Sequence, residues 1–201
     1  MQYSMGMVSA AFVTTYALNT FNPHIVLMCG VCAGVKGKTN IGDLMVLTPV
    51  LNYEYGKRDK GGFQPGYRQR QINGKIRSVI EKMSSDERLL ENIRRGFEYK
   101  NGKPDKQLEV KICSGASGSA VVTDEGIVKE IISCQRDVGA IDMEAYAVAE
   151  ISCIALEKEI PWLVVKGVQD FADEDKNDKY RQYAAYVSAA FLKKFLEEYY
   201  N

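Results

Sequence analysis

Short apolar runs that alternate with longer, helix-spaced segments are the feature that most limits how this chain can fold. A continuous apolar run bounded by glycine or charged residues is typical of a strand that is buried on both faces. We expect strands over 24–29, 43–47, 108–113, 138–141 and 162–168, and helices over 7–20, 73–100 with a break at 84–86, 123–134, 144–156 and 179–201. This order predicts an α/β fold of three layers, in which a mostly parallel or mixed central sheet is flanked by helices.

Length and charge narrow the class of protein further. The 201 residues fit one domain over 1–201. Lysine plus arginine and aspartate plus glutamate both number 26, so no basic face is expected to attract nucleic acid. No apolar run is long enough to span a membrane, and the first residues lack the blocks of a signal peptide. We therefore expect a cytoplasmic protein that binds a small molecule and neither nucleic acid nor a membrane.

The pair Cys29-Gly30-Val31-Cys32 has the spacing of redox and zinc motifs. A redox motif would open a helix after a strand, whereas 33–37 is expected to continue as a loop. A zinc site would need two more ligands, and the only histidine is His24. The chain has five cysteines, an odd number that cannot all pair within one chain, which indicates a reducing compartment. We favour buried free thiols here, with no metal and no cofactor.

The segment 52–71 is rich in glycine, tyrosine and basic residues and has no clear period. Long loops inside compact domains are usually functional. Two alternatives stay open, namely a lid that contacts the substrate and a surface hairpin. The amphipathic helix expected at 179–200 is typical of a helix that covers a sheet.

The ends of the expected strands carry the polar residues. In sheets of this kind, ligands bind beyond the carboxyl ends of the strands. Small residues follow at 30–34 and 114–119, and carboxylates follow at 142–144 and 169–173. One acid at a helix start is favoured by the helix dipole by up to about 1 kcal/mol. The second acid of the Asp142-Met143-Glu144 junction indicates a site for a polar small molecule.

These strand ends carry a recognisable set of motifs. The segments are Gly30-Val31-Cys32-Ala33-Gly34, Ala116–Val122, Ile141–Ala145, and Lys166–Asp173 followed by Lys176-Asn177 and Tyr183-Ala184-Ala185. In order and spacing they resemble the purine nucleoside phosphorylase and methylthioadenosine/S-adenosylhomocysteine nucleosidase superfamily, from about Gly6 to the C-terminus. Residues 52–57 and 169–177 look most like nucleosidase-type domains fused to sensor modules in bacterial and fungal immune-like proteins. The resemblance implies a nucleoside phosphorylase-like fold and a homo-oligomer.

The chemistry of that family gives the two acids separate roles. Cleaving a ribosyl N-glycosidic bond builds an oxocarbenium-like sugar, and the departing base needs a proton. By resemblance, Glu144 accepts hydrogen bonds from ribose hydroxyls and Met143 packs against the sugar. Asp170 is the expected general acid toward purine N7 and must hold its proton near neutral pH. Asp142 is either a substrate-binding residue or a structural one, because strand side chains alternate in direction.

Other substrate contacts are also implied by the resemblance. Val121 and Val122 match positions that hold the base, where family members often carry an aromatic residue. Cys32, Ala33 and Gly34 match the loop beside the sugar where water or phosphate attacks, although a tight turn alone would explain the glycines. We also expect Phe171, next to the acid, to bind the substrate.

The attacking group is inferred from one position. Phosphate-using relatives place an arginine just before the glycine loop, because arginine binds phosphate in a forked geometry. The matching residue is Met28, which favours water. Family members also usually begin with a strand-helix-strand segment that carries a general-base glutamate. Its absence from this sequence leads us to expect an N-terminally short domain with an exposed sheet edge.

The expected function is therefore a purine nucleosidase. It would hydrolyse the N-glycosidic bond of adenosine-type compounds, namely methylthioadenosine, S-adenosylhomocysteine, adenosine or AMP/ATP. The alternatives are a purine nucleoside phosphorylase and a catalytically impaired nucleoside-binding or interaction module. A 5'-phosphate would need cations, for which Lys57, Arg58 and Arg68 are candidates, whereas a thioether would need an apolar pocket.

Overall fold

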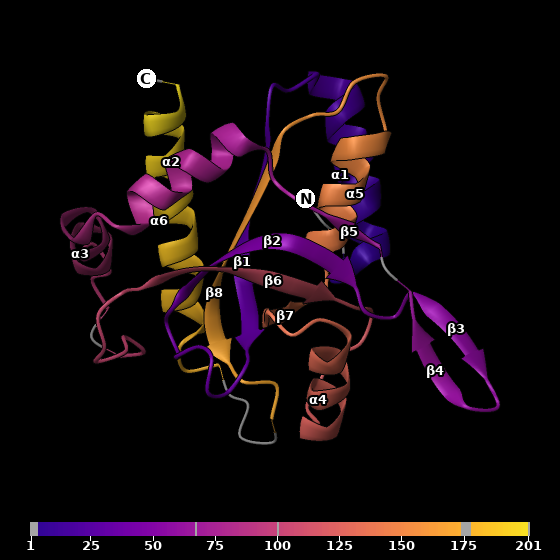
Figure 1. Cartoon of the computed structure of the whole chain (residues 1–201). Coiled ribbons are helices and arrows are strands. Elements are labelled where there is room, and N and C mark those ends of the chain that lie inside the picture. Colours follow the sequence, from indigo (N-terminus) through magenta and orange to yellow (C-terminus); the bar gives the residue numbers. More distant parts are fainter. Residues whose placement is uncertain (1–3, 67, 100, 174–177, 201) are drawn as a thin grey trace.

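The computed structural model describes residues 4–66, 68–99, 101–173 and 178–200. Its elements, in order, are α1 (Met7–Phe21), β1 (Val26–Gly34), β2 (Leu44–Asn52), β3 (Gly56–Asp59), β4 (Gly62–Pro65), β5 (Gln69–Arg70), α2 (Gly74–Ser84), α3 (Glu87–Arg95), β6 (Val110–Ser117), α4 (Glu125–Cys134), β7 (Val138–Asp142), α5 (Ala145–Ile154), β8 (Trp162–Asp170) and α6 (Arg181–Tyr199). The α/β alternation predicted from the sequence is confirmed (Figure 1). Tyr67, Lys176 and Asn177 lie outside the described residues.

The central sheet is mixed and closes on itself. Its six strands run in the order β5-β2-β6-β7-β1-β8, and β8 additionally pairs with β2. The pairs β1–β8, β2–β6 and β6–β7 are parallel, whereas β1–β7, β2–β5 and β2–β8 are antiparallel. An exposed sheet edge was expected for an N-terminally short domain; in the described part of the chain β8 is not such an edge, because Leu44–Val46 of β2 pair with Val165–Gly167.

Helices cover the sheet on two sides (Figure 1). On one side α6 packs on β8 and β1, and α2 and α3 pack on α6. At Gly167 an added Cβ would lie 2.3 Å from the carbonyl oxygen of Ala184, so glycine allows α6 to approach β8 directly. On the other side α5 contacts the sheet and α1 packs on α5. The last helix covers the sheet, as its amphipathic pattern predicted.

The first strand extends further than the sequence indicated. Residues 30–34 were expected to form a loop or tight turn, but Gly30 and Val31 pair with β8, and Ala33 and Gly34 pair with β7. Gly30 therefore does not end β1, because β1 is hydrogen-bonded to β8 there and to β7 further on. Since side chains alternate along a strand, Cys29 and Cys32 point to opposite faces. Cys29 is exposed and Cys32 is buried, which does not fit a redox pair.

Of the two alternatives for the segment 52–71, a lid over the substrate and a surface hairpin, its described residues form the hairpin. Strands β3 and β4 pair with each other, and β5 adds to β2 through Val50 and Leu51. The hairpin projects from the body of the molecule in Figure 1.

Candidate functional site

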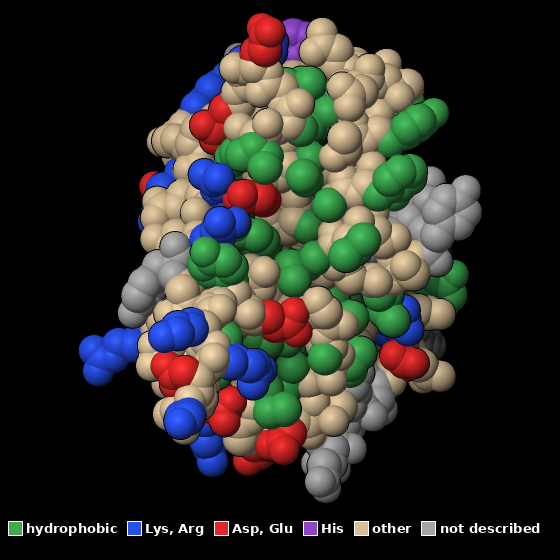
Figure 2. All heavy atoms as spheres, turned by 90° about the vertical axis from the view of Figure 1, so that its right-hand side faces the viewer, with side chains coloured by type: hydrophobic (Ala, Val, Ile, Leu, Met, Phe, Trp, Pro, Cys, Tyr) green, Lys and Arg blue, Asp and Glu red, His purple; other side chains and the backbone are tan. Residues whose placement is uncertain are grey.

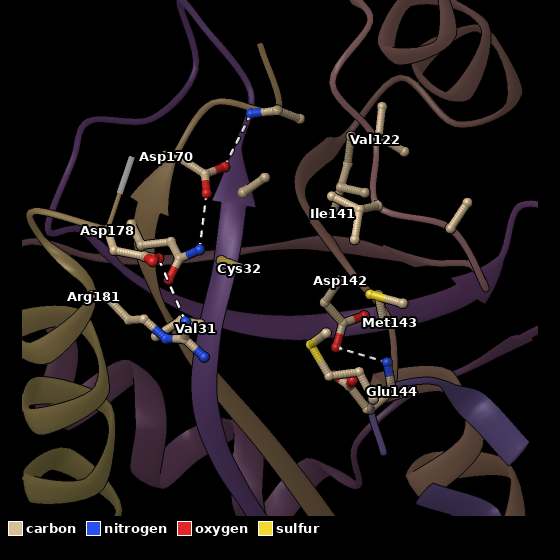
Figure 3. Close-up of a pocket in the computed structure, with 16 residues that line it drawn as sticks. Val31, Cys32, Val122, Ile141, Asp142, Met143, Glu144, Asp170, Asp178 and Arg181 are labelled. Carbon is tan, nitrogen blue, oxygen red and sulfur yellow. Dashed lines mark hydrogen bonds and ion pairs between the residues drawn. The ribbon is translucent and has the colours of Figure 1, made fainter. Parts of the chain in front are cut away.

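A cavity of about 340 Å³ lies where the carboxyl ends of β1, β7 and β8 meet. Its size falls in the range of small-molecule sites, about 300–1,000 Å³. In Figure 3, Asp170, Asp178 and Arg181 line one wall, and residues 141–144 with Val122 line the other. Val31 and Cys32 lie between the two walls. Three strand ends and the start of α6 therefore share one pocket.

Most of the residues predicted for the site line this cavity. They are Cys32, Ala33, Val121, Val122, Asp142, Met143, Glu144 and Asp170. Gly34 and Phe171 do not. Gly34 pairs with Ala140 and packs closely against Thr39 and Val168. Phe171 turns away from the cavity and packs against the main hydrophobic core, so its proximity to the acid in sequence was misleading.

Asp142 is held inside the protein by several partners. Its Oδ1 accepts a hydrogen bond from Ser117 Oγ at 2.5 Å. Its Oδ2 accepts from the backbone N–H groups of Glu144 and Ala145, at the start of α5. Such a cap satisfies amides that have no partner within the helix. Although Asp142 lines the cavity, these contacts favour the structural one of its two predicted roles.

Glu144 faces the cavity and is fixed by two donors. Its Oε1 accepts a hydrogen bond from Gly6 N at 3.1 Å, and its Oε2 lies 3.2 Å from Lys166 Nζ. Lys166 Nζ is also 3.1 Å from Asp142 Oδ2. Gly6 has a φ of 111°, a conformation that favours glycine. The carboxylate is thus anchored by two residues far away in the sequence.

Lys166 is a buried lysine that sequence reasoning left without a role. Burial alone would lower the pKa of its ammonium, but attraction to Asp142 and Glu144 outweighs burial and raises the pKa. The lysine therefore stays charged at neutral pH. Two carboxylates and one ammonium leave one net negative charge beside the cavity. In the sequence, Lys166 could have been noticed as the single charged residue inside the apolar run Trp-Leu-Val-Val-Lys-Gly-Val.

A bulge in β8 brings two polar side chains to the cavity. Cys32 pairs with Val168 and Ala33 pairs with Asp170, so Gln169 is an extra residue on β8. Bulges redirect side chains and occur often beside active sites. Gln169 lines the same cavity as Asp170 and donates from Nε2 to Asp170 Oδ2 at 2.8 Å. Strict alternation would have placed these neighbours on opposite faces.

The turn after Asp170 is strained. Ala172 is buried and has a φ of 56°, a left-handed conformation that costs a non-glycine residue about 1 kcal/mol or more. Its backbone N–H donates to Asp170 Oδ1 at 3.1 Å. Backbone strain of this kind clusters at functional sites. The turn fixes the direction of the Asp170 carboxyl group.

The part of the opposite wall that Val121 and Val122 form is apolar and lies on the irregular segment 118–124. Val122 is buried, while Val121 is 50 % exposed at the cavity mouth. Glu54 braces the segment by accepting a hydrogen bond from Ser119 N at 2.9 Å. This wall offers flat apolar contact and backbone groups, as expected for a base-binding surface.

The basic residues of the hairpin segment do not reach the cavity. Arg58 stacks on Phe63, and Arg68 stacks on Tyr55. Lys57 pairs with Asp59 at 3.6 Å. None of the three lines the cavity, so the structure does not support them as the cations that would bind a 5'-phosphate.

Two classes of feature are not found in the described ranges. There, no group of three or more His, Cys, Asp or Glu residues is arranged to hold a metal ion. In the same part of the chain, no helix has both the length and the apolar character to cross a membrane.

The geometry can be compared with known proteins. A sequence model described as the phosphorylase superfamily matches residues 1–200. The chain belongs to the phosphorylase superfamily. The family resemblance predicted from the strand-end motifs is confirmed.

Its relatives include enzymes that act on nucleosides and nucleotides. The chain is 32 % identical over 190 residues to Uncharacterized protein y4jS of Sinorhizobium fredii, covering 92 % of this chain and 46 % of that protein. It is 28 % identical over 205 residues to ATP nucleosidase Cap17 of Escherichia coli, covering 96 % and 40 %. It is 27 % identical over 206 residues to 5'-methylthioadenosine/S-adenosylhomocysteine nucleosidase of Bacillus cereus, covering 96 % and 78 %. The chain thus spans less than half the length of the first two relatives.

Solved structures confirm the fold. The 5'-methylthioadenosine/S-adenosylhomocysteine nucleosidase of Neisseria meningitidis, in complex with methylthio-immucillin-A, matches with a TM-score of 0.71 at 23 % identity, covering 96 % of this chain and 78 % of that one. Futalosine hydrolase of Helicobacter pylori matches with a TM-score of 0.75 at 21 % identity, covering 97 % and 77 %.

Proposed function

We propose that this chain hydrolyses the N-glycosidic bond of adenosine-type nucleosides or nucleotides. The observation that carries the proposal is that Glu144 and Asp170 line one nucleoside-sized cavity together with Val122 and Met143. The nucleosidases among its relatives support the same reaction class.

In this proposal the base lies between Val122 and Asp170, and the sugar lies against Met143 and Glu144. As the bond from C1' to the base nitrogen breaks, the electron pair leaves with the base. Asp170 donates a proton to the base, which makes it a better leaving group. Glu144 accepts hydrogen bonds from the ribose hydroxyls, and its charge stabilises the positive sugar. Water then bonds to C1' from the side of Cys32 and gives up one proton to solvent, which leaves a hydroxyl on C1'.

The net charge of the buried cluster supports this electrostatic role. Lys166 compensates one of the two acids, Asp142 and Glu144, and leaves one negative charge near the expected sugar position. Without Lys166 the two carboxylates would repel each other, and Glu144 would lose one of the two donors that fix its position. Lys166 is therefore proposed as a positioning residue for Glu144.

The direct test is release of free base. The purified protein is incubated with adenosine, methylthioadenosine, AMP and ATP, with and without phosphate, and the products are separated by chromatography. Asp170→Asn should lower base release by at least about 10²-fold, because its isosteric amide cannot supply the proton. Asp137→Asn, an exposed site away from the cavity, serves as the control. Turnover of Asp170→Asn at the parent rate would exclude it as the acid, and no base from any substrate would favour a binding module.

We also propose that the protein is a cytoplasmic homo-oligomer. Val8, Phe12 and Tyr16 of α1 recur every four residues and are each between 63 % and 87 % exposed. Figure 2 shows hydrophobic side chains gathered on the side of the molecule where α1 lies. Exposed apolar stripes of this kind commonly mark association surfaces. The free state of all five cysteines supports a reducing location.

Sedimentation tests the oligomer directly. The parent should sediment as a dimer or larger species, and Phe12→Glu should shift it toward the monomer because a charge is costly inside an apolar interface. A monomeric parent at assay concentrations would rule the proposal out.

A further inference from the structure

Arg181, the first residue of α6, is the only cation that lines the cavity within the described residues. Figure 3 shows it on the same wall as Asp170, but toward the end of the cavity where Met143 and Glu144 lie and away from Val122. If the base lies at Val122, the guanidinium lies beyond the sugar. A cation there can meet a group attached to the ribose or a group that attacks it.

The guanidinium of Arg181 keeps donors for a ligand. Within the described residues its ion pair is with Asp178, at 3.5 Å, and both side chains are more than half exposed. Such exposed, long pairs contribute little. A guanidinium has five N–H donors in a rigid fork that matches a phosphoryl group.

Gln169 independently indicates a ligand at this wall. It is 9 % exposed and lines the cavity, and its Oε1 is a buried acceptor with no hydrogen-bond partner among the described atoms. Buried polar atoms are nearly always paired, so an unpaired one that lines a cavity points to a missing donor. The amide is held by its Nε2 contact with Asp170. A ligand hydroxyl or amine would satisfy it.

A second depression continues outward from Arg181. Arg181 and Asp178 line both hollows, and Lys103, Lys179 and Gln182 line the second one. Its described charged residues are Lys103, Lys179 and Arg181 against Asp105 and Asp178, which leaves one net positive charge. The cavity therefore opens at this end toward a polar, cationic surface rather than an apolar channel.

We propose that Arg181 forms a subsite for a phosphoryl group at the sugar end of the cavity, an inference that rests on the proposed nucleosidase function. The phosphoryl group has two possible sources. It is either the 5'-phosphate of a nucleotide substrate or inorganic phosphate that takes the place of water. A methylthio group would leave the guanidinium without an acceptor.

The products differ between the two sources. With a nucleotide, a water oxygen bonds to C1' and gives up one proton to solvent, while the N-glycosidic bond breaks and its electron pair leaves with the base. The base takes a proton from Asp170, and the products are free base and ribose 5-phosphate. With inorganic phosphate, a phosphate oxygen bonds to C1' and the same bond breaks, giving free base and ribose 1-phosphate. Met28, at the position where phosphate-using relatives place an arginine, does not line the cavity, so its identity does not decide against phosphate.

The test compares Arg181→Gln with Arg77→Gln, an exposed arginine on α2 that pairs with Glu81 away from the cavity. Base release is measured with adenosine, methylthioadenosine and AMP, and with adenosine plus inorganic phosphate. Loss of a charge-assisted contact should lower the ratio of kcat/KM for AMP to that for adenosine by at least about tenfold. If phosphate is the source, ribose 1-phosphate forms with the parent, and Arg181→Gln raises the KM for phosphate by a similar factor. Arg77→Gln should change neither quantity.

Binding keeps this test separate from the proposed reaction. Calorimetric titration with AMP, adenosine and inorganic phosphate should show tighter binding of AMP than of adenosine, or binding of phosphate, with either preference weakened in Arg181→Gln. If no base is released by the parent, the nucleosidase proposal fails, while an Arg181-dependent preference in binding still supports the subsite. If the variant matches the parent in substrate ratio, phosphate dependence and binding, the subsite is wrong. Circular dichroism confirms that the variant is folded.

Discussion

Replacement of Lys166 by methionine should destabilise the protein strongly, because it removes the cation from a buried cluster. Nζ lies 3.1 Å from Asp142 and 3.2 Å from Glu144, and each attraction is worth about 5 kcal/mol before desolvation, at an effective dielectric constant of about 20. Desolvation of the ammonium offsets much of this sum. Removal of one partner from a buried ion pair costs about 3–5 kcal/mol. We expect the free energy of unfolding to fall by that amount at neutral pH.

The pH dependence gives the prediction a second signature. In the parent the pKa of Lys166 is raised in the folded state, so its stabilisation is complete at neutral pH and is lost only as the pH rises through the folded pKa. In the variant, Asp142 and Glu144 face each other without a cation. The difference in stability between parent and variant should therefore be fully present at neutral pH and shrink only as the pH rises through the folded pKa of Lys166.

Thermal or urea unfolding measures the effect, with Lys82→Met as the matched control. Lys82 Nζ lies 2.8 Å from Glu198, but both side chains are exposed, so the control should lose less than about 1 kcal/mol. For a chain of this size each kcal/mol shifts Tm by about 2–4 °C. A loss below about 1 kcal/mol for Lys166→Met, or a loss that grows as the pH is raised above neutral, would refute the reasoning.

Two further predictions follow from the thiols and from Gly6. In the native protein Cys29 should react rapidly with a thiol reagent, whereas Cys32 should react only after unfolding, because burial raises the pKa of its thiol well above the ordinary value. Cys29→Ser should abolish the fast phase and Cys32→Ser should leave it; the reverse pattern would contradict the burial assignment. Gly6→Ala should cost about 1 kcal/mol or more, because φ is 111° there. It should also raise the KM for substrate, because its N–H orients Glu144, and an unchanged KM would show that this contact is dispensable.

The regular elements were predictable because their signals are local. The helix at 7–20 and the strand at 138–141 appear within one or two residues of their expected ends, as α1 and β7. Helical spacing of apolar residues and continuous apolar runs both reflect which residues are buried, whatever the arrangement of the elements in the fold. The break at 84–86 was equally readable, since Asp86 caps α3 through the backbone N–H of Leu89.

The site was only partly predictable because its geometry depends on pairing between distant strands. The two glycines of β1 looked like a turn, and only β7 and β8 hold them in a strand. Gln169 lines the cavity through a bulge that depends on the register with β1. Phe171 lies outside the cavity because it packs against the main hydrophobic core, a long-range contact that the local sequence does not reveal. The assignments of Asp170 and Glu144 as catalytic residues stay predictions.

The closed sheet has a consequence for how such a site can diverge. Asp170 lies at the end of β8, a strand that is hydrogen-bonded to neighbours on both sides. Val121 and Val122 lie instead on a segment without regular structure. A strand with hydrogen-bonded neighbours on both sides tolerates little substitution or displacement, whereas irregular surface segments accept substitutions readily. Selection could thus change the proposed base-binding residues Val121 and Val122 while Asp170, the proposed proton donor, stays in place. New substrate preferences would then arise without rebuilding the reaction chemistry.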